Sequence, residues 1–150
     1  MFGLKHLVTS KVENNSGKHI YVLHNRITMS EYIRIRALFT IEKDNVEQYK
    51  ELMKEMSNMV ETHEPTTLVY EVYFNEDGTK CMVHETYVDS TAVLAHNFST
   101  ASKTILPRIF KISKLVSLDV YGNPNSELKK LLKRFNSQIF TLYTGFDRKN

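Results

Sequence analysis

Apolar and polar residues alternate with a period of two along several stretches of the chain, which is the pattern of β-strands with one buried face. The clearest stretch is 32–41. Its apolar face consists of Ile33, Ile35, Ala37, Phe39 and Ile41. Residues 67–74 and 80–88 alternate in the same way. The segment 75–78 between them ends in a glycine, which adopts the positive φ of a hairpin turn without steric cost.

Apolar residues spaced by three and four predict a long helix after the first strand. The stripe consists of Val46, Tyr49, Met53, Met56 and Val60, widened by Leu52 and Met59. Asp44 is a good N-cap, and Glu47 completes a pattern like a capping box. The helix is expected to end at 63–65, because the residue before Pro65 is disfavoured in the helical region.

Two shorter helices are expected after the hairpin. Asp89 or Ser90 caps the first of them, and the pair 99–100 interrupts it or caps a further helix. Pro107 lies inside that further helix. It predicts either a kink or a helix that begins only near Thr104.

The C-terminal part predicts strand, helix and strand. Residues 115–121 and 138–146 alternate as strands, and 126–135 have helical periodicity. The apolar side chains of that helix are Leu128, Leu131, Leu132 and Phe135, which are expected to point inward.

The order of elements from residue 32 is β-α-β-β-α-β, followed by an extra C-terminal helix and strand. This order is that of the ferredoxin-like split βαβ unit, an α+β fold with an antiparallel sheet covered by helices on one face. The second face of the sheet also carries apolar residues, because both sets of alternating positions are apolar: Tyr70, Val72 and Phe74 alternate with Val69 and Tyr73, and Val83 alternates with Met82 and Val88. Because a sheet that is apolar on both faces needs a second cover, we expect a homodimer that forms through this sheet face.

Residues 1–28 differ from the rest of the chain. The segment 14–18 is a loop signal, 19–24 could form a short strand, and 29–30 would be a natural start for the domain. We therefore expect one domain over 29–150. The segment 1–28 is then an N-terminal extension of the reading frame, a flexible leader or an extra edge strand.

Composition excludes several classes of protein. A net charge of +3 is too weak to indicate nucleic acid, and no apolar run is long enough to span a membrane. Cys81 is the single cysteine, so no disulfide forms within the chain, and a cytoplasmic protein is expected. Cys and His lack metal-ligand spacing, so we expect no metal.

Three short motifs resemble the antibiotic biosynthesis monooxygenase family. They are Tyr-Glu-Val-Tyr at 70–73, His-Glu-Thr-Tyr at 84–87 and Ala-x-x-x-His at 92–96. The segment 120–124 resembles a subset of that family, and the resemblance covers roughly 30–146. The second motif departs from the family pattern, which usually has tryptophan where Tyr87 stands, and the chain has no tryptophan. The resemblance implies a dimeric α+β barrel and an oxygenase that acts on quinols or phenols without a cofactor, with molecular oxygen as co-substrate.

His96 occupies the position of the family histidine, so the resemblance implies a base that removes a phenol proton. Glu85 could orient His96 or bind a substrate hydroxyl; alternatively it is structural and pairs with Arg34 or Arg36 across the sheet. Both His96 and Glu85 are taken as catalytic candidates. The substrate-binding candidates are Tyr87, Tyr73, Arg36 and Met56. The aromatic residues and the methionine could equally be ordinary core or dimer contacts.

The sequence leaves three functions open. The first is a cofactor-independent monooxygenase of a small quinol or phenolic compound, in which an apolar pocket holds the substrate beside His96. The second is a non-catalytic dimeric module that binds a small aromatic or apolar ligand. The third is an isomerase on the same scaffold, which would turn over substrate without consuming oxygen.

Overall fold

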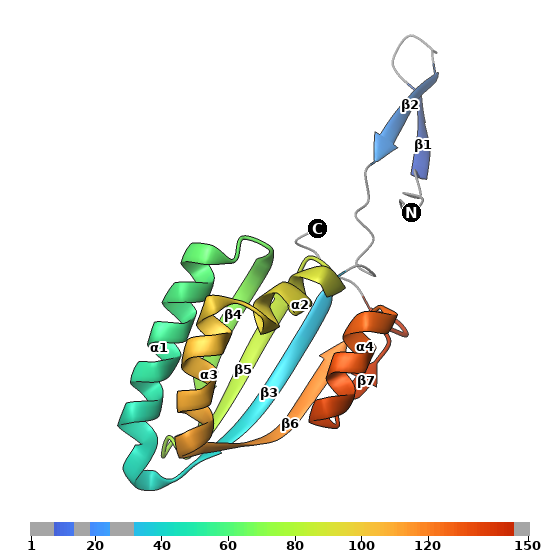
Figure 1. Ribbon diagram of the computed structural model, residues 1–150. Helices are drawn as coiled ribbons and strands as arrows, with labels where there is room; N and C mark the ends of the chain where they lie inside the picture. The colour runs from blue at the N-terminus through green and yellow to red at the C-terminus, as the bar shows by residue number, and fades with distance from the viewer. Residues whose placement is uncertain (1–7, 14–18, 25–31, 146–150) are drawn as a thin grey trace.

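The computed structural model describes residues 8–13, 19–24 and 32–145 (Figure 1). The domain contains strands and helices in the order β3 (Ile33–Ile41), η1 (Lys43–Asn45), α1 (Val46–His63), β4 (Thr67–Phe74), β5 (Lys80–Tyr87), α2 (Ser90–Asn97), α3 (Thr100–Ile112), β6 (Ser113–Tyr121), α4 (Ser126–Leu132), η2 (Lys133–Phe135) and β7 (Gln138–Phe140). This order confirms the predicted ferredoxin-like α+β fold.

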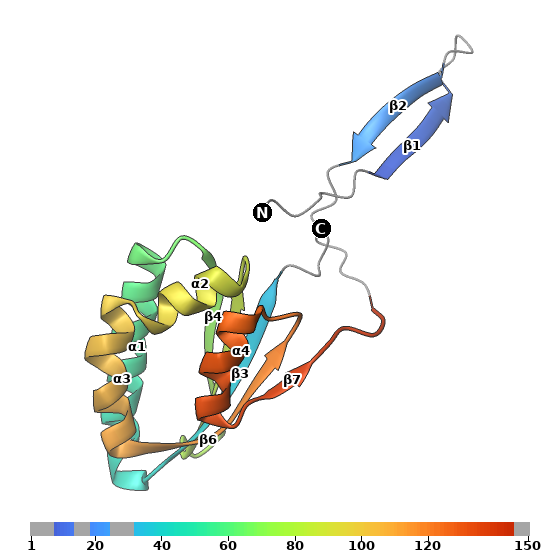
Figure 2. The ribbon, with the colours of Figure 1, turned by 45° about the vertical axis from the view of Figure 1, so that its right-hand side comes forward.

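The five strands form one sheet in the order β4-β5-β3-β6-β7. The first four pair antiparallel, and β7 pairs parallel to β6. The helices cover one face of this sheet, with α1 and α3 over one end and α2 and α4 over the other (Figure 2). We call the face beneath the helices the inner face and the opposite face the outer face.

Strand β3 is central because it pairs with β5 on one side and β6 on the other. The five odd-numbered apolar residues predicted for its buried face are all buried. Their partners on β5 extend the inner face, since Ala37 pairs with Val83 and Ile35 pairs with Glu85. The alternation of β3 therefore decides which side chains of β5 lie beneath the helices.

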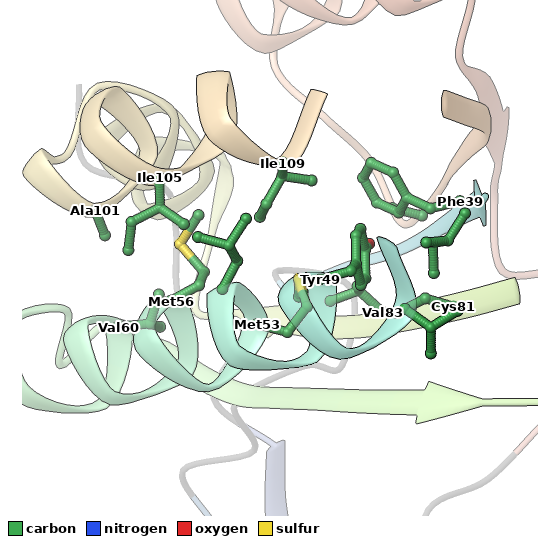
Figure 3. Packing of buried hydrophobic residues seen from close by; sticks show 14 residues of the cluster. Phe39, Tyr49, Met53, Met56, Val60, Cys81, Val83, Ala101, Ile105 and Ile109 are labelled. Atoms are coloured by element: carbon green, nitrogen blue, oxygen red, sulfur yellow. The ribbon is translucent and has the colours of Figure 1, made fainter. Parts of the chain in front are cut away.

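The main core lies where α1 and α3 cross the sheet (Figure 3). Tyr49 and Met56 of α1 are fully buried there, as is Ile105 of α3. Phe39 and Val83 supply the sheet side of the cluster. The helical stripe predicted for α1 thus packs as predicted, and burial of these side chains is the main source of stability at this end of the sheet.

Several local predictions are wrong. Asp44 does not cap α1, because it lies within the 3-10 turn η1 and the N-cap residue is Asn45. Helix α3 begins at Thr100 and continues through Pro107, so a start near Thr104 is wrong, whereas the alternative of a kink at Pro107 stays a prediction. Its N-cap is Ser99, whose side chain accepts a hydrogen bond from the backbone N–H of Ser102, as the re-capping alternative predicted.

The C-terminal segment is less regular than predicted. Helix α4 ends at Leu132 and passes into η2, and Phe135 in that turn is one-third exposed rather than fully buried. Strand β7 spans only Gln138–Phe140 instead of reaching residue 146. Leu128 and Leu132 are buried against the inner face, as predicted.

The described parts of the N-terminal segment are two strands. β1 (Val8–Glu13) pairs antiparallel with β2 (His19–His24), which is the short strand that the sequence predicted. Their two-stranded sheet is separate from the five-stranded one. The predicted loop at 14–18 and the predicted domain start at 29–30 lie outside the described residues. Across the described ranges, no helix combines the length and the apolar character that a membrane span needs.

Candidate active site

His96 lies on α2. Asp89 is the N-cap residue of this helix, and its side chain accepts a hydrogen bond from the backbone N–H of Ala92 at 2.9 Å. The hydroxyl of Ser102 on α3 donates to the backbone oxygen of His96 at 2.6 Å. Helix α2 is thereby fixed at both ends. The His96 side chain is only 11% exposed, so it points into the domain rather than toward solvent.

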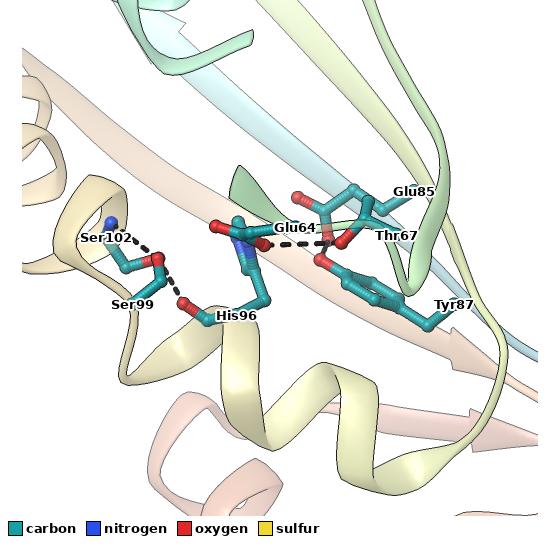
Figure 4. A network of polar contacts seen from close by, with 7 residues as sticks. All are labelled: Glu64, Thr67, Glu85, Tyr87, His96, Ser99 and Ser102. Carbon is teal, nitrogen blue, oxygen red and sulfur yellow. Dashed lines mark hydrogen bonds and ion pairs between the residues drawn. The ribbon is translucent and has the colours of Figure 1, made fainter. Parts of the chain in front are cut away.

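Glu64 holds the imidazole of His96. His96 Nδ1 lies 2.7 Å from Glu64 Oε2, and Thr67 Oγ1 donates to the same oxygen at 3.2 Å (Figure 4). The Glu64 side chain is 9% exposed. Because a carboxylate can only accept, it selects the form of His96 that carries a proton on Nδ1 and, in the neutral ring, leaves Nε2 unprotonated as a base.

Sequence reasoning missed Glu64. It is the C-cap residue of α1, 32 positions before His96. The only local signal was the proline that follows it, which was interpreted as a helix end. Nothing in the spacing of the two residues indicates that they meet, because the contact depends on how α1 and α2 pack over the sheet.

Glu85 and Tyr87 extend from the inner face of β5 toward His96. The Tyr87 hydroxyl donates to Glu85 Oε2 at 3.0 Å. Burial raises the pKa of Glu85, and the nearby His96 partly opposes this increase. Burial and the neighbouring Glu85 hold the pKa of Tyr87 well above its usual range. Both groups are therefore biased toward their protonated, neutral forms.

Tyr70 completes the cluster and was not among the predicted site residues. It lies on the inner face of β4, where it pairs with Glu85. Burial and Glu85 raise the pKa of Tyr70. The rings of Tyr70 and Tyr87 lie 6.1 and 5.6 Å from the His96 ring, centre to centre. The imidazole therefore lies between two phenol rings and two carboxyl groups.

This cluster forms one end of a cavity of about 100 Å³ beneath α2, α3 and α4, which we call the substrate cavity. Its polar wall includes His96, Glu85 and Tyr87. The remaining walls are mostly apolar, and the partly exposed rings of Phe110 and Phe135 also line it. An apolar cavity with a few convergent polar groups is the usual form of a small-molecule site.

Three predicted substrate-binding residues do not line this cavity. Arg36 and Tyr73 lie on the outer face, where Arg36 stacks on Tyr121 and the Tyr73 hydroxyl donates to Glu71. The alternative that Glu85 pairs with Arg34 or Arg36 is wrong, because Glu85 faces inward and both arginines face outward. Met56 is fully buried in the main core, and Met53 lines the cavity instead.

The arrangement offers acid–base chemistry within an apolar site. No cluster of three or more His, Cys, Asp or Glu side chains suited to a metal ion occurs in the described part of the chain. The groups that can act are an imidazole base, a carboxyl group biased toward its acid form and two phenols. These groups can remove a proton from a bound substrate and donate a hydrogen bond to one of its oxygen atoms.

Comparison with known proteins adds a sequence family and several similar folds. Residues 32–108 match the family described as antibiotic biosynthesis monooxygenase. No curated protein sequence matches the chain. The structure of MupZ from Pseudomonas fluorescens is similar, with 26% identity, a TM-score of 0.68, and coverage of 79% of this chain and 95% of MupZ.

Two further solved structures share the fold at lower identity. A conserved protein from Bacteroides thetaiotaomicron is 17% identical, with a TM-score of 0.56 and coverage of 61% of this chain and 96% of its own. A candidate antibiotic biosynthesis monooxygenase from Caulobacter crescentus is 14% identical, with a TM-score of 0.57 and coverage of 64% and 92%. Both proteins therefore share the fold of this chain over nearly their full length.

Proposed function

The chain belongs to the antibiotic biosynthesis monooxygenase family, and we propose that it is a cofactor-independent monooxygenase that oxidises a small quinol or phenolic compound. The observation that carries this proposal is the placement of His96. Its ring is held by Glu64 on one side and lines an apolar cavity on the other. A base at the wall of a site that is otherwise mostly apolar is what the deprotonation of a phenol requires.

In this mechanism His96 takes the hydroxyl proton of the bound phenol. The resulting anion is electron-rich and reacts with molecular oxygen, which is the co-substrate. One oxygen atom enters the product and the other leaves as water, so a phenol and O₂ give a quinone and H₂O. The substrate supplies all four electrons that reduce O₂, and the protein supplies a base, orientation and a site with little water.

Glu85 and Tyr87 orient the substrate in this proposal. Because burial raises the pKa of Glu85, its carboxyl group is biased toward the neutral acid, which can donate a hydrogen bond. The Tyr87 hydroxyl donates a hydrogen bond to Oε2 of that carboxyl group. The carboxyl group is then available to an oxygen atom of a substrate that lies in the cavity.

The cavity volume restricts the substrate. An apolar protein cavity of about 150 Å³ accommodates benzene, and the substrate cavity has about 100 Å³. A single-ring compound would therefore fill it completely and press on its lining side chains. A larger substrate would have to displace Phe110 or Phe135, which are partly exposed and are not locked into the core.

Oxygen uptake in the presence of ¹⁸O₂ tests the proposal. Purified protein would be mixed with a panel of quinols and polyphenols, and the products analysed by mass spectrometry. We expect uptake with at least one compound and one ¹⁸O atom per product molecule. Product without ¹⁸O, or no turnover of any compound, would contradict the proposal; binding without turnover would favour the non-catalytic module.

An isomerase is the second candidate, and one observation favours it. The site brings together a base, His96, and a carboxyl group biased toward its acid form, Glu85. Such a pair can move a proton between two positions of one substrate without oxygen. An isomerase would give turnover that is equally fast under nitrogen and under air, whereas the monooxygenase would stop under nitrogen.

We also propose that the protein is a homodimer that forms through the outer face and acts in the reducing cytoplasm, where Cys81 stays a thiol. The outer face combines apolar Leu38, Val69 and Met82 with half-exposed Tyr73. Sedimentation at micromolar concentration should show a dimer. Leu38→Asp should give a folded monomer, and a wild-type monomer would contradict this part of the proposal.

A further inference from the structure

Glu64 lies between two cavities. Its Oε2 atom contacts His96, which lines the substrate cavity. Glu64 itself lines a second cavity of about 420 Å³ between the end of α1 and the start of α3. The other lining residues of this second cavity are Met59, His63, Ser99, Thr100 and Ala101. Glu64 does not line the substrate cavity, but it contacts His96, which does. The Glu64 carboxylate therefore connects the two cavities.

The other oxygen of Glu64 needs a hydrogen-bond donor. Oε1 is buried and has no hydrogen-bond partner among the residues that the structure describes. A buried carboxylate oxygen without a donor is costly, and such atoms are usually satisfied by ordered water where a polar space allows it. The second cavity is roomy, and His63, Ser99 and Thr100 make part of its wall polar. Oε1 is not itself exposed to this cavity, so a water molecule has to enter from the cavity to supply the missing donor.

We propose that Glu64 positions His96 and carries its proton to and from water in the second cavity, on the side away from the substrate. This inference rests on the proposed role of His96 as the base. When His96 has taken a proton at Nε2, the Nδ1 proton can pass to Oε2 of Glu64 and from Glu64 to a water molecule, which leaves a neutral ring protonated at Nε2. The Nε2 proton then goes to the oxygen atom that leaves as water, and Glu64 returns a proton from the second cavity to Nδ1. The base is restored without net loss of a proton, and the substrate cavity need not open to solvent for the exchange.

The groups around His96 support this direction of transfer. Glu85 and Tyr87 face it from β5, and Tyr70 faces it from β4. Burial raises the pKa values of all three, which biases them toward holding their own protons. From α3, Ser102 contacts only the backbone oxygen of His96. Glu64 is thus the one described group that is hydrogen-bonded to the ring and also reaches the second cavity.

The first test replaces Glu64 with glutamine, which keeps the shape but cannot carry the proton. We expect kcat to fall about a hundredfold, the low end of an acid–base contribution, with KM unchanged because Glu64 does not line the substrate cavity. Glu61→Gln, on the exposed side of the same helix, is the matched control and should change neither constant. Glu64→Asp should recover part of kcat.

The second test measures the proton directly in substrate-free protein. With ¹⁵N-labelled histidine, NMR reports which ring nitrogen of His96 is protonated and how fast that proton exchanges with water. We expect protonation of Nδ1 in the wild type and a slower exchange of that proton with water in Glu64→Gln. Because this measurement needs no turnover, it separates a failure of the relay from a failure of the proposed reaction.

The third test fills the second cavity. Thr100→Phe places a ring at an exposed lining position, and Thr104→Phe makes the same change one turn later, outside the cavity. The first variant should slow the exchange of the His96 proton, and the second should not. Unchanged exchange and unchanged kcat in both Glu64→Gln and Thr100→Phe would overturn the inference, whereas slowed exchange in both would support it.

Discussion

The two ends of strand β5 use the same inner face for different purposes. Cys81 and Val83 lie beneath α1 and α3, where they are almost fully buried in an apolar cluster. Glu85 and Tyr87 follow on the same face beneath α2, where they hydrogen-bond to each other beside His96. The helix that covers a given stretch of the strand therefore decides whether its inward side chains build the core or the site.

This difference has a physical cause. The buried stripe of helix α1 is apolar apart from the hydroxyl of Tyr49, so the core end offers a carboxylate no charged partner. Helix α2 is short, and it presents His96 beside the Glu64 carboxylate from the end of α1. Polar side chains can be buried at that end because His96 pairs with Glu64 and Tyr87 pairs with Glu85.

A charge at the core end should have the largest effect. Val83→Asp would bury a carboxylate among apolar side chains, and the loss of several kcal/mol is comparable with the whole stability of a small domain. We expect a protein that is unfolded by circular dichroism at room temperature. Lys80→Asp, at an exposed position of the same strand, should stay folded. A folded Val83→Asp protein would contradict the assignment of this end as core.

Truncation of a methionine separates the two ends. Met56→Ala should lower the free energy of unfolding by about 2–5 kcal/mol, because the side chain is fully buried. Its KM should not change, since Met56 does not line the substrate cavity. Met53→Ala should change KM as well as stability, because Met53 lines the cavity. Urea denaturation and steady-state kinetics measure both; equal KM values in the two variants would break the distinction.

The carboxyl group at the site end should make stability depend on pH. The pKa of Glu85 is raised in the folded state, so the folded protein holds this proton more tightly than the unfolded chain. The wild type should therefore lose stability relative to Glu85→Gln as pH rises from the unfolded pKa of about 4.3 through the folded pKa. Chemical denaturation from pH 4 to 8 measures the difference. A wild type that gains stability relative to Glu85→Gln as pH rises would contradict the raised pKa of Glu85.

The smallest effect is expected on the surface above the core. Arg108 of α3 donates to both oxygens of Glu55 on α1, and both side chains are about half exposed. Exposed pairs of this kind contribute about 0.2–1 kcal/mol, so Arg108→Ala should be close to neutral. A double-mutant cycle with Glu55→Ala measures the coupling. A value well above 1 kcal/mol would show that the core end depends on charge as well as on apolar packing.

Much of the fold could be predicted from the sequence because it follows from periodicity. The alternation along β3 identified its buried face, and the spacing of apolar residues identified α1. Alternation cannot show which face of β4 lies beneath the helices. For this reason Tyr73 was assigned to the site while Tyr70, three residues earlier and on the opposite face, was missed.

The site was predictable only in part. The resemblance selected His96, Glu85 and Tyr87, and the structure brings these three together at one cavity. Arg36 was assigned to the site although the apolar odd positions of β3 direct it to the outer face. Glu64 could not be found, because its contact with His96 depends on the packing of helix ends that are distant in the chain.

The rate of oxygen uptake by His96→Ala tests the central claim most directly. The variant would be compared with the wild type on the same substrate, with thermal unfolding confirming that both are folded. We predict a loss of about 10²- to 10⁴-fold, the contribution of a general base, with no large change in melting temperature. Full turnover by the folded variant would contradict the claim that the chemistry of this protein lies at the site end of β5.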